Sequence, residues 1–114
     1  MENCIFCRII AGKAPGEVLY KDELVCAFRD AHPAASTHVL VVPTKHIASV
    51  NEITPEDEAS IGHLFTVARQ IARQEGIDQN GYRLIVNTGP YAGQVVPHVH
   101  LHLIGGQRVR TSLG

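Results

Sequence analysis

The sequence lacks the features that would mark a secreted, membrane-spanning or nucleic-acid-binding protein. Its 114 residues contain no tryptophan and three cysteines, and an odd number of cysteines in so short a chain disfavours a disulfide framework. The first residues show no basic segment followed by an apolar run, and no stretch reaches membrane-spanning length. The formal net charge of −1 leaves no strongly basic surface for nucleic acid or anionic lipid. We therefore expect a cytoplasmic protein without a nucleic-acid or membrane partner.

The overall composition is that of a small globular protein. Hydrophobic residues make up 45% of the chain and charged residues 18%, a balance that argues against disorder. A chain of this length can bury one modest core but not two, and it contains no repeat, low-complexity tract or linker. We expect a single domain over residues 1–114.

Hydrophobic periodicity and turn residues predict two helices and five strands. A short helix over residues 4–11 ends at Gly12, and a long helix begins at Thr54, has Pro55 in its first position and ends at Gly76. The strands are expected over residues 18–20, 24–28, 38–43, 82–87 and 98–104. Because short turns favour antiparallel pairing, we expect an α+β fold with a roughly five-stranded antiparallel meander sheet, one long helix and one short helix.

Three histidines alternate with aliphatic residues in the last predicted strand, at His98, His100 and His102. A strand has a side-chain period of two, so the three imidazoles would share one face while residues 99, 101 and 103 pack on the other. Each buried imidazole needs hydrogen-bond partners, which makes three in a row costly for structure alone. Histidine can act as nucleophile, proton donor and metal ligand. The pattern predicts a site that handles phosphate or a metal.

The cysteine pair Cys4 and Cys7 has the two-residue gap of paired zinc ligands and of redox dithiols. A redox pair is expected after a buried strand, and here only residues 1–3 precede it, so zinc is the favoured interpretation. The third cysteine, Cys26, lies in an apolar stretch and is expected to be an inert core residue.

A glycine-containing loop lies just before the histidines. Gly89, Gly93 and Gln94 could bring backbone N–H groups close to phosphate oxygens, and Asn87 could donate its amide to the same oxygens. Most such loops are only turns, but the position directly upstream of three aligned histidines favours a functional role.

Together these residues resemble the histidine triad family. The segment His-Val-His-Leu-His-Leu-Ile at 98–104 fits the family pattern, and six further segments match in order along nearly the whole chain: Cys4-Ile-Phe-Cys7-Arg-Ile-Ile10, Ala27-Phe-Arg-Asp30, Thr37-His-Val-Leu-Val-Val-Pro43, Lys45-His-Ile47, Tyr82-Arg-Leu-Ile-Val-Asn87 and Gly93-Gln94. The likeness is greater to the small nucleoside-phosphoramidase branch than to the dinucleoside polyphosphate hydrolases or the uridylyltransferases.

The resemblance implies hydrolysis of purine nucleoside 5′-phosphoramidates and related adenylates, with release of a nucleoside monophosphate. His100 would be the nucleophile that attacks the α-phosphorus and carries the nucleotidyl group, and His38 would orient it or relay protons. Asp30 would accept hydrogen bonds from the ribose hydroxyls. The phosphate oxygens would be held by His102, Asn87, Gly93, Gln94 and the backbone of Val95.

The resemblance also implies a purine slot, a structural metal and an assembly state. The slot would be formed by Phe6, Ile9, Phe28 and Leu40, which can equally be ordinary core residues. A closed structural zinc site would be formed by Cys4, Cys7, His46 and His98, with no organic cofactor. The chain would form a homodimer whose long helices pack together, with residues 61–72 serving both core and interface.

The chain departs from the branch at two places. Val95 stands where phosphoramidases often carry a serine near the leaving group, so a hydroxyl contribution is absent there. The segment 105–114 lacks the tryptophan found near the terminus of some relatives, and the tail helps to set leaving-group choice in this branch. Amine specificity is therefore open.

Two other functions compete with a phosphoramidase. One is hydrolysis of dinucleoside polyphosphates or transfer of the nucleotidyl group to another acceptor, and the other is a nucleotide-binding or scaffold protein with incidental turnover. The nearly complete set of His38, Asn87 and the three triad histidines favours an enzyme.

Overall fold

A five-stranded antiparallel sheet forms the centre of the molecule, with one helix on each face. The computed structural model describes residues 1–109. Its strands are β1 (Val18–Lys21), β2 (Val25–Arg29), β3 (Thr37–Pro43), β4 (Tyr82–Ile85) and β5 (Leu101–Gly105), in the spatial order β1-β2-β3-β5-β4. The short helix α1 (Ile5–Ile10) and the long helix α2 (Glu58–Gln74) complete the regular structure, together with three short 3₁₀ turns at Val50–Glu52, Pro55–Asp57 and Pro90–Ala92.

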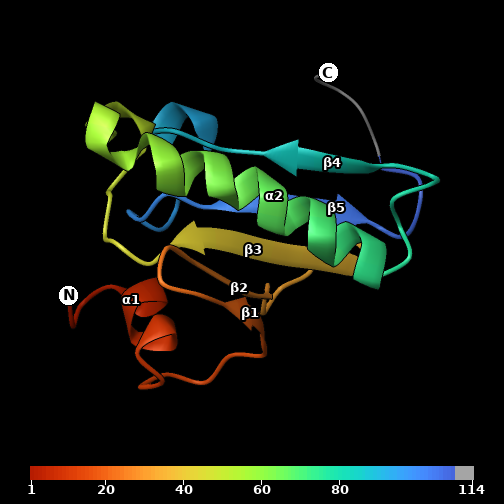
Figure 1. The fold of residues 1–114 in the computed structure, drawn as a ribbon, viewed down its shortest axis with the longest axis horizontal. Helices are drawn as coiled ribbons and strands as arrows, with labels where there is room; N and C mark the ends of the chain where they lie inside the picture. The colour runs from red at the N-terminus through yellow and green to blue at the C-terminus, as the bar shows by residue number, and fades with distance from the viewer. Residues whose placement is uncertain (110–114) are drawn as a thin grey trace.

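The predicted α+β class, the five antiparallel strands and the two helices are confirmed, but the meander order is wrong for the last two strands. β5 lies between β3 and β4, so β4 forms an edge of the sheet. The long connection through α2 allows the chain to cross over to that edge before β5 returns beside β3 (Figure 1). A strand that follows a helix of this length is not bound to pair with its predecessor, and local turn signals carry no information about that choice.

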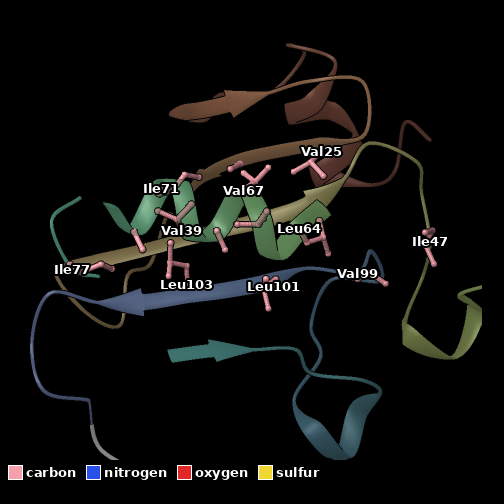
Figure 2. Close-up of a cluster of buried hydrophobic side chains, with 14 residues drawn as sticks. Val25, Val39, Ile47, Leu64, Val67, Ile71, Ile77, Val99, Leu101 and Leu103 are labelled. Atoms are coloured by element: carbon pink, nitrogen blue, oxygen red, sulfur yellow. The ribbon is translucent and has the colours of Figure 1, made fainter. Parts of the chain in front are cut away.

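The main core fills the space between α2 and one face of the sheet (Figure 2). Alternate residues of β3 and β5, such as Val39 and Leu103, pack against the apolar stripe of α2 that contains Leu64 and Ile71. Leu64, Ile71, Val39 and Leu103 are at most 1% exposed. All seven residues of β3 are buried because both faces of this central strand are covered. The strand therefore reads as a continuous apolar run rather than an alternating one.

A second, smaller core covers the opposite face of the sheet. Phe6 of α1 packs there against Phe28 of β2 and Leu40 of β3, and Cys26 is fully buried in the same cluster, as expected. The α1 helix is only six residues long. Helices this short are not stable in isolation, so its position depends on this packing. The three histidines lie on this face.

The helix ends were predicted to within a few residues. The first turn of the predicted long helix is the 3₁₀ turn Pro55–Asp57, where the Thr54 N–H donates to the Asp57 carboxylate at 2.9 Å. α2 proper begins at Glu58 and is followed by Gly76 with φ +72°, a left-handed conformation that glycine adopts without strain. In the described part of the chain, no helix is long and apolar enough to cross a membrane.

Candidate active site and metal site

The histidine segment alternates as predicted, although β5 begins only at Leu101. Residues before it leave the ladder: the Val99 N–H donates to the Ile47 carbonyl at 2.8 Å instead of pairing with β3. Val99 still packs in the main core with Leu101, while His98 and His100 are buried on the opposite face. The period of two therefore continues beyond the end of the regular strand.

The orientation of the His100 ring is fixed by the backbone. Its Nδ1 lies 2.7 Å from the carbonyl oxygen of His98. A carbonyl only accepts hydrogen bonds, so Nδ1 carries a proton, and in the neutral ring the lone pair is therefore on Nε2. His100 is 7% exposed. Its ring and that of Phe6 pack in a T-shaped arrangement, with ring centres 5.1 Å apart. The backbone thus occupies Nδ1 of His100 and leaves Nε2 as the ring nitrogen that a substrate could reach.

His102 is fixed in the opposite tautomer through His38. The Ala34 N–H donates to Nδ1 of His38 at 2.9 Å, so the proton of His38 is on Nε2. That Nε2 lies 2.9 Å from Nδ1 of His102 and 3.4 Å from Oδ2 of Asp30. His102 therefore accepts at Nδ1 and carries its proton on Nε2, where it is a hydrogen-bond donor.

This chain of hydrogen bonds also places His38 beside His102. His38 is linked by this bond to His102, whose ring centre is 4.9 Å from that of His100. Burial, followed by the charge that His100 would carry, lowers the pKa of His102 to about 4, so His102 is neutral at pH 7. Both nitrogens of His38 are engaged in hydrogen bonds, so the group Asp30, His38 and His102 has no lone pair on His38 with which to bind a metal.

The residues expected to form the purine slot come together in the smaller core. Phe6 meets Phe28 edge-on with ring centres 5.3 Å apart, and Leu40 and Ile9 pack in the same cluster. Phe6, Phe28 and Leu40 are buried, and Ile9 is half-buried. Of the four residues, Ile9 keeps the most surface.

The loop before the histidines is shaped by its own hydrogen bonds. The side-chain oxygen of Gln94 accepts from the Gly89 N–H at 2.9 Å, and its amide donates to the carbonyls of Ala48 and Val96. The N–H groups of Gly93 and Gln94 donate to the carbonyls of Pro90 and Gly89. These two residues therefore hold the loop in shape, and a phosphate would have to share or replace these bonds.

Val95 and Asn87, the two other residues of this region that were expected to bind phosphate, differ from each other in burial. Val95 is 89% exposed on the loop, which leaves its side chain open to solvent. Asn87 is half-buried just beyond the end of β4 at Ile85, because the regular strand is two residues shorter than predicted. Residues 110–114 of the tail, to which leaving-group choice was tied, lie outside the described part of the chain.

Four potential zinc ligands meet where α1 packs against the sheet. Nδ1 of His98 lies 3.4 Å from Sγ of Cys4 and 3.5 Å from Sγ of Cys7, and Nδ1 of His46 lies 3.4 Å from Sγ of Cys7. All four donor atoms are within 4.8 Å of one another. Tetrahedral zinc, with bonds of about 2.3 Å to sulfur and about 2.0–2.1 Å to nitrogen, places such donors about 3.5 Å apart. The four side chains fit the metal.

The protonation of His98 also suits a metal ligand. Its Nε2 lies 2.9 Å from the Pro43 carbonyl, so the proton is on Nε2 and the Nδ1 lone pair faces the cysteines. Burial lowers the pKa of His98 to about 4, although the bond to Pro43 opposes the shift. Burial, followed by the neighbouring Cys4 thiol, raises the pKa of Cys7 to about 11. Reactive dithiols have lowered thiol pKa values, so the redox interpretation is disfavoured.

The groups that sequence reasoning missed are backbone atoms. The carbonyls of His98 and Pro43 and the N–H of Ala34 decide which nitrogen of each imidazole is protonated. No side-chain motif signals them, because every residue carries the same backbone groups and only the fold determines where they point.

Comparisons with known proteins agree on the family. Residues 11–109 match the HIT domain model, a range that begins after Cys4 and Cys7. The chain is 48% identical over 106 residues to the purine nucleoside phosphoramidase of Escherichia coli K12, covering 93% of this chain and 89% of that protein.

Solved structures show the same fold. The HIT family hydrolase of Legionella pneumophila superposes with a TM-score of 0.94 at 40% identity, covering 98% of this chain and 100% of that one. A Zn-bound histidine triad family protein of Mycobacterium smegmatis gives a TM-score of 0.80 at 30% identity, covering 99% and 81%. The chain therefore belongs to the HIT domain family.

Proposed function

We propose that this protein hydrolyses purine nucleoside 5′-phosphoramidates and related adenylates to a nucleoside monophosphate. The observation that carries the proposal is the 2.7 Å hydrogen bond from Nδ1 of His100 to the His98 carbonyl, which leaves the Nε2 lone pair for attack on phosphorus. The 48% identity to an E. coli protein named purine nucleoside phosphoramidase supports the choice of substrate.

The reaction takes place in two displacements at the α-phosphorus. Nε2 of His100 forms a bond to phosphorus while the P–N bond to the leaving amine breaks, and the amine takes up a proton. Water then attacks the same phosphorus and the P–Nε2 bond breaks. The proton that the water loses balances the proton that the amine took up in the first displacement. The products are a free amine, a nucleoside monophosphate and the neutral histidine.

The neighbouring residues bind the substrate and stabilise charge. The Nε2–H of His102 donates to a phosphate oxygen as negative charge develops, and His38 keeps that proton on Nε2 through its 2.9 Å bond. Asp30 accepts from the ribose hydroxyls. Asn87 and the loop residues Gly93, Gln94 and Val95 lie around the phosphate, and the purine stacks over Phe6, Ile9, Phe28 and Leu40.

We further propose that Cys4, Cys7, His46 and His98 hold a structural zinc ion. When bound, zinc would supply a closed four-coordinate link and no chemistry on the substrate. The ligands join α1 to the segments that precede α2 and β5. The carbonyl of His98 contacts His100, and its ring is one of the four proposed metal ligands. His100 is not among these four ligands.

The expected homodimer is also part of the proposal. Phe65 on α2 is 49% exposed and Val86 beyond β4 is 39% exposed, and β4 is an edge strand. A second copy of the chain would cover these exposed apolar side chains. Sedimentation equilibrium tests the dimer: a single species at the monomer mass would contradict it. The cytoplasmic location stays a prediction.

A turnover panel tests the proposed function. Adenosine 5′-phosphoramidate, diadenosine tetraphosphate and an adenylate with an alternative acceptor are supplied separately to the zinc-loaded protein. We expect the highest kcat/KM for the phosphoramidate, with adenosine monophosphate as product. Preference for the tetraphosphate or for transfer to the acceptor would favour the rival enzymes. Nucleotide binding without turnover of any substrate would favour a binding protein.

A further inference from the structure

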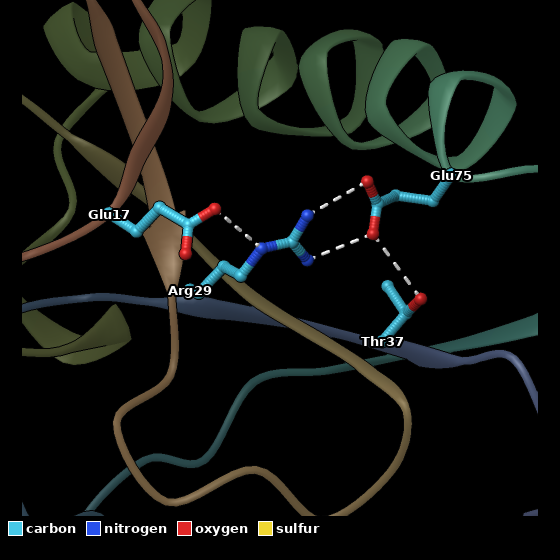
Figure 3. A network of polar contacts seen from close by, with 4 residues as sticks. All are labelled: Glu17, Arg29, Thr37 and Glu75. Carbon is cyan, nitrogen blue, oxygen red and sulfur yellow. Dashed lines mark hydrogen bonds and ion pairs between the residues drawn. The ribbon is translucent and has the colours of Figure 1, made fainter.

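A network of polar contacts joins Arg29 and Thr37 of the sheet to Glu17 and Glu75 (Figure 3). Arg29, the last residue of β2, makes two hydrogen bonds to Glu75, from Nη1 to Oε1 at 2.9 Å and from Nη2 to Oε2 at 3.0 Å. The Thr37 hydroxyl donates to the same carboxylate at 3.4 Å. Glu75 thus joins the end of β2 to the start of β3 from its place just after α2.

Each strand partner of Glu75 immediately precedes a residue of the proposed site. Arg29 is followed by Asp30, and Thr37 is followed by His38. Because side chains alternate between the two faces of a sheet, Arg29 and Thr37 face α2 while Asp30 and His38 face the histidines. The backbone also links the two residues that face the histidines: the Asp30 N–H donates to the His38 carbonyl at 2.9 Å.

The position of the Glu75 carboxylate is unfavourable within its own helix. It is the C-terminal cap residue of α2, and a negative charge at a helix C-terminus is unfavourable because it faces the negative end of the dipole. The side chains of Glu75 and Arg29 are 22% and 33% exposed, whereas Glu17, the other partner of Arg29, is 67% exposed. The bidentate pair between Arg29 and Glu75 is the tightly held part of the network.

We propose that Glu75 is a positioning residue for the reaction: through Arg29 and Thr37 it holds Asp30 in place for the ribose and His38 in place for His102. The inference rests on the proposed function, because it assigns Glu75 to the same site. Glu75 acts from the far face of the sheet and touches no substrate. Its loss is expected to displace the two strand ends and to weaken both contacts together.

The test compares Glu75→Ala and the nearly isosteric Glu75→Gln with a control on the same helix. His63→Gln alters a 2.6 Å hydrogen bond between α2 and Asp22 in the turn between β1 and β2, away from the triad histidines. The side chains of His63 and Asp22 are each 29% exposed, close to the exposure of the Glu75 pair. This control reports what the loss of a polar contact between α2 and the sheet does in general.

The first measurement is kcat/KM for adenosine 5′-phosphoramidate and for its 2′,3′-dideoxy analogue. We expect Glu75→Ala to lose about tenfold on the ribose substrate, with the ratio of the two substrates falling toward that of Asp30→Ala. Glu75→Gln should lie between wild type and Glu75→Ala because one acceptor oxygen remains. His63→Gln should keep the wild-type ratio. An unchanged ratio in Glu75→Ala would overturn the proposal.

The second measurement needs no substrate. Side-chain ¹⁵N chemical shifts distinguish the two neutral tautomers of His102, and we expect the Nε2–H form in wild type and a mixture in Glu75→Ala. If the wild type does not turn over phosphoramidates, the proposed function fails, but this spectrum still decides the role of Glu75. A pure Nε2–H form in Glu75→Ala shows that His38 is held without Glu75 and refutes the inference.

Discussion

Replacing both cysteines of the proposed zinc site, by Cys4→Ser with Cys7→Ser, is expected to abolish metal binding and release α1 before the rest of the fold. The α1 helix has six residues and a single buried side chain, Phe6. A helix of this length has little stability of its own, so its attachment depends on the small core and on the metal ligands. The main core between α2 and the sheet contains neither cysteine and should survive the replacement.

The size of the effect follows from ligand linkage. A ligand present at 100 times its dissociation constant stabilises the folded state by about 2.7 kcal/mol. For a domain of roughly 100 residues, 1 kcal/mol corresponds to about 4 °C or more in melting temperature. Zinc should therefore raise the melting temperature of the wild type by about 10 °C and leave the double variant unchanged. Amide hydrogen exchange in residues 5–10 should accelerate most when zinc is removed, and turnover at His100 should change less.

Elemental analysis of protein purified without chelator, followed by thermal unfolding with and without zinc, checks this prediction. We expect one zinc per chain, with occupancy that falls at low pH because thiolates must be deprotonated to bind metal. Cys26→Ala is the matched control, since it removes the one cysteine that lies outside the ligand set and should keep full occupancy. Zinc well below one per chain in the wild type, or full occupancy in the double variant, would refute the reasoning.

Three other predictions concern the histidines and the ribose. His100→Ala should abolish turnover while nucleoside monophosphate binding stays within about tenfold, because the remaining phosphate contacts persist; calorimetry and a turnover assay decide this, and unchanged turnover would exclude His100 as nucleophile. Asp30→Ala should weaken binding of ribonucleotides more than of 2′,3′-dideoxy analogues, whereas an equal loss would make Asp30 a structural residue. The pKa of His102 is lowered to about 4 by burial, so between pH 6.5 and pH 4 the unfolded chain binds more protons and stability falls as pH falls, by on the order of 2–3 kcal/mol. Urea unfolding of chelator-treated protein should show a shallower pH dependence for His102→Gln than for wild type, and parallel curves would contradict the shift.

Much of the fold could be predicted because local chemistry and tertiary structure agree. Alternating apolar residues, the Thr54 and Pro55 start signals and the glycine after α2 specify elements that the structure contains. The position of β4 at the edge of the sheet could not be predicted from these signals. After α2 the chain could pair the next strand with β3 or leave that position for β5. The choice depends on long-range packing, which local sequence signals do not report.

The candidate site was predictable in its side chains and not in its hydrogen bonding. Gln94 illustrates the limit: its type and position indicate a phosphate ligand, yet its amide bridges Gly89, Ala48 and Val96 and holds the loop. Glu75 carries no motif at all and comes close to the site only because α2 ends beside the start of β3. Both outcomes depend on segments that are distant in sequence.

The tautomers explain how three identical side chains on one face can do different work. Side-chain alternation places His98, His100 and His102 on the same side, but each ring nitrogen finds a different partner. His98 donates to the Pro43 carbonyl and turns a lone pair to the cysteines, whereas His100 donates to the His98 carbonyl and keeps a lone pair on the other nitrogen. His102 accepts from His38 and keeps a proton to donate. The proposed ligand, nucleophile and donor are therefore distinguished by backbone geometry and by one neighbouring histidine, which is why the residues around the triad matter as much as the triad itself.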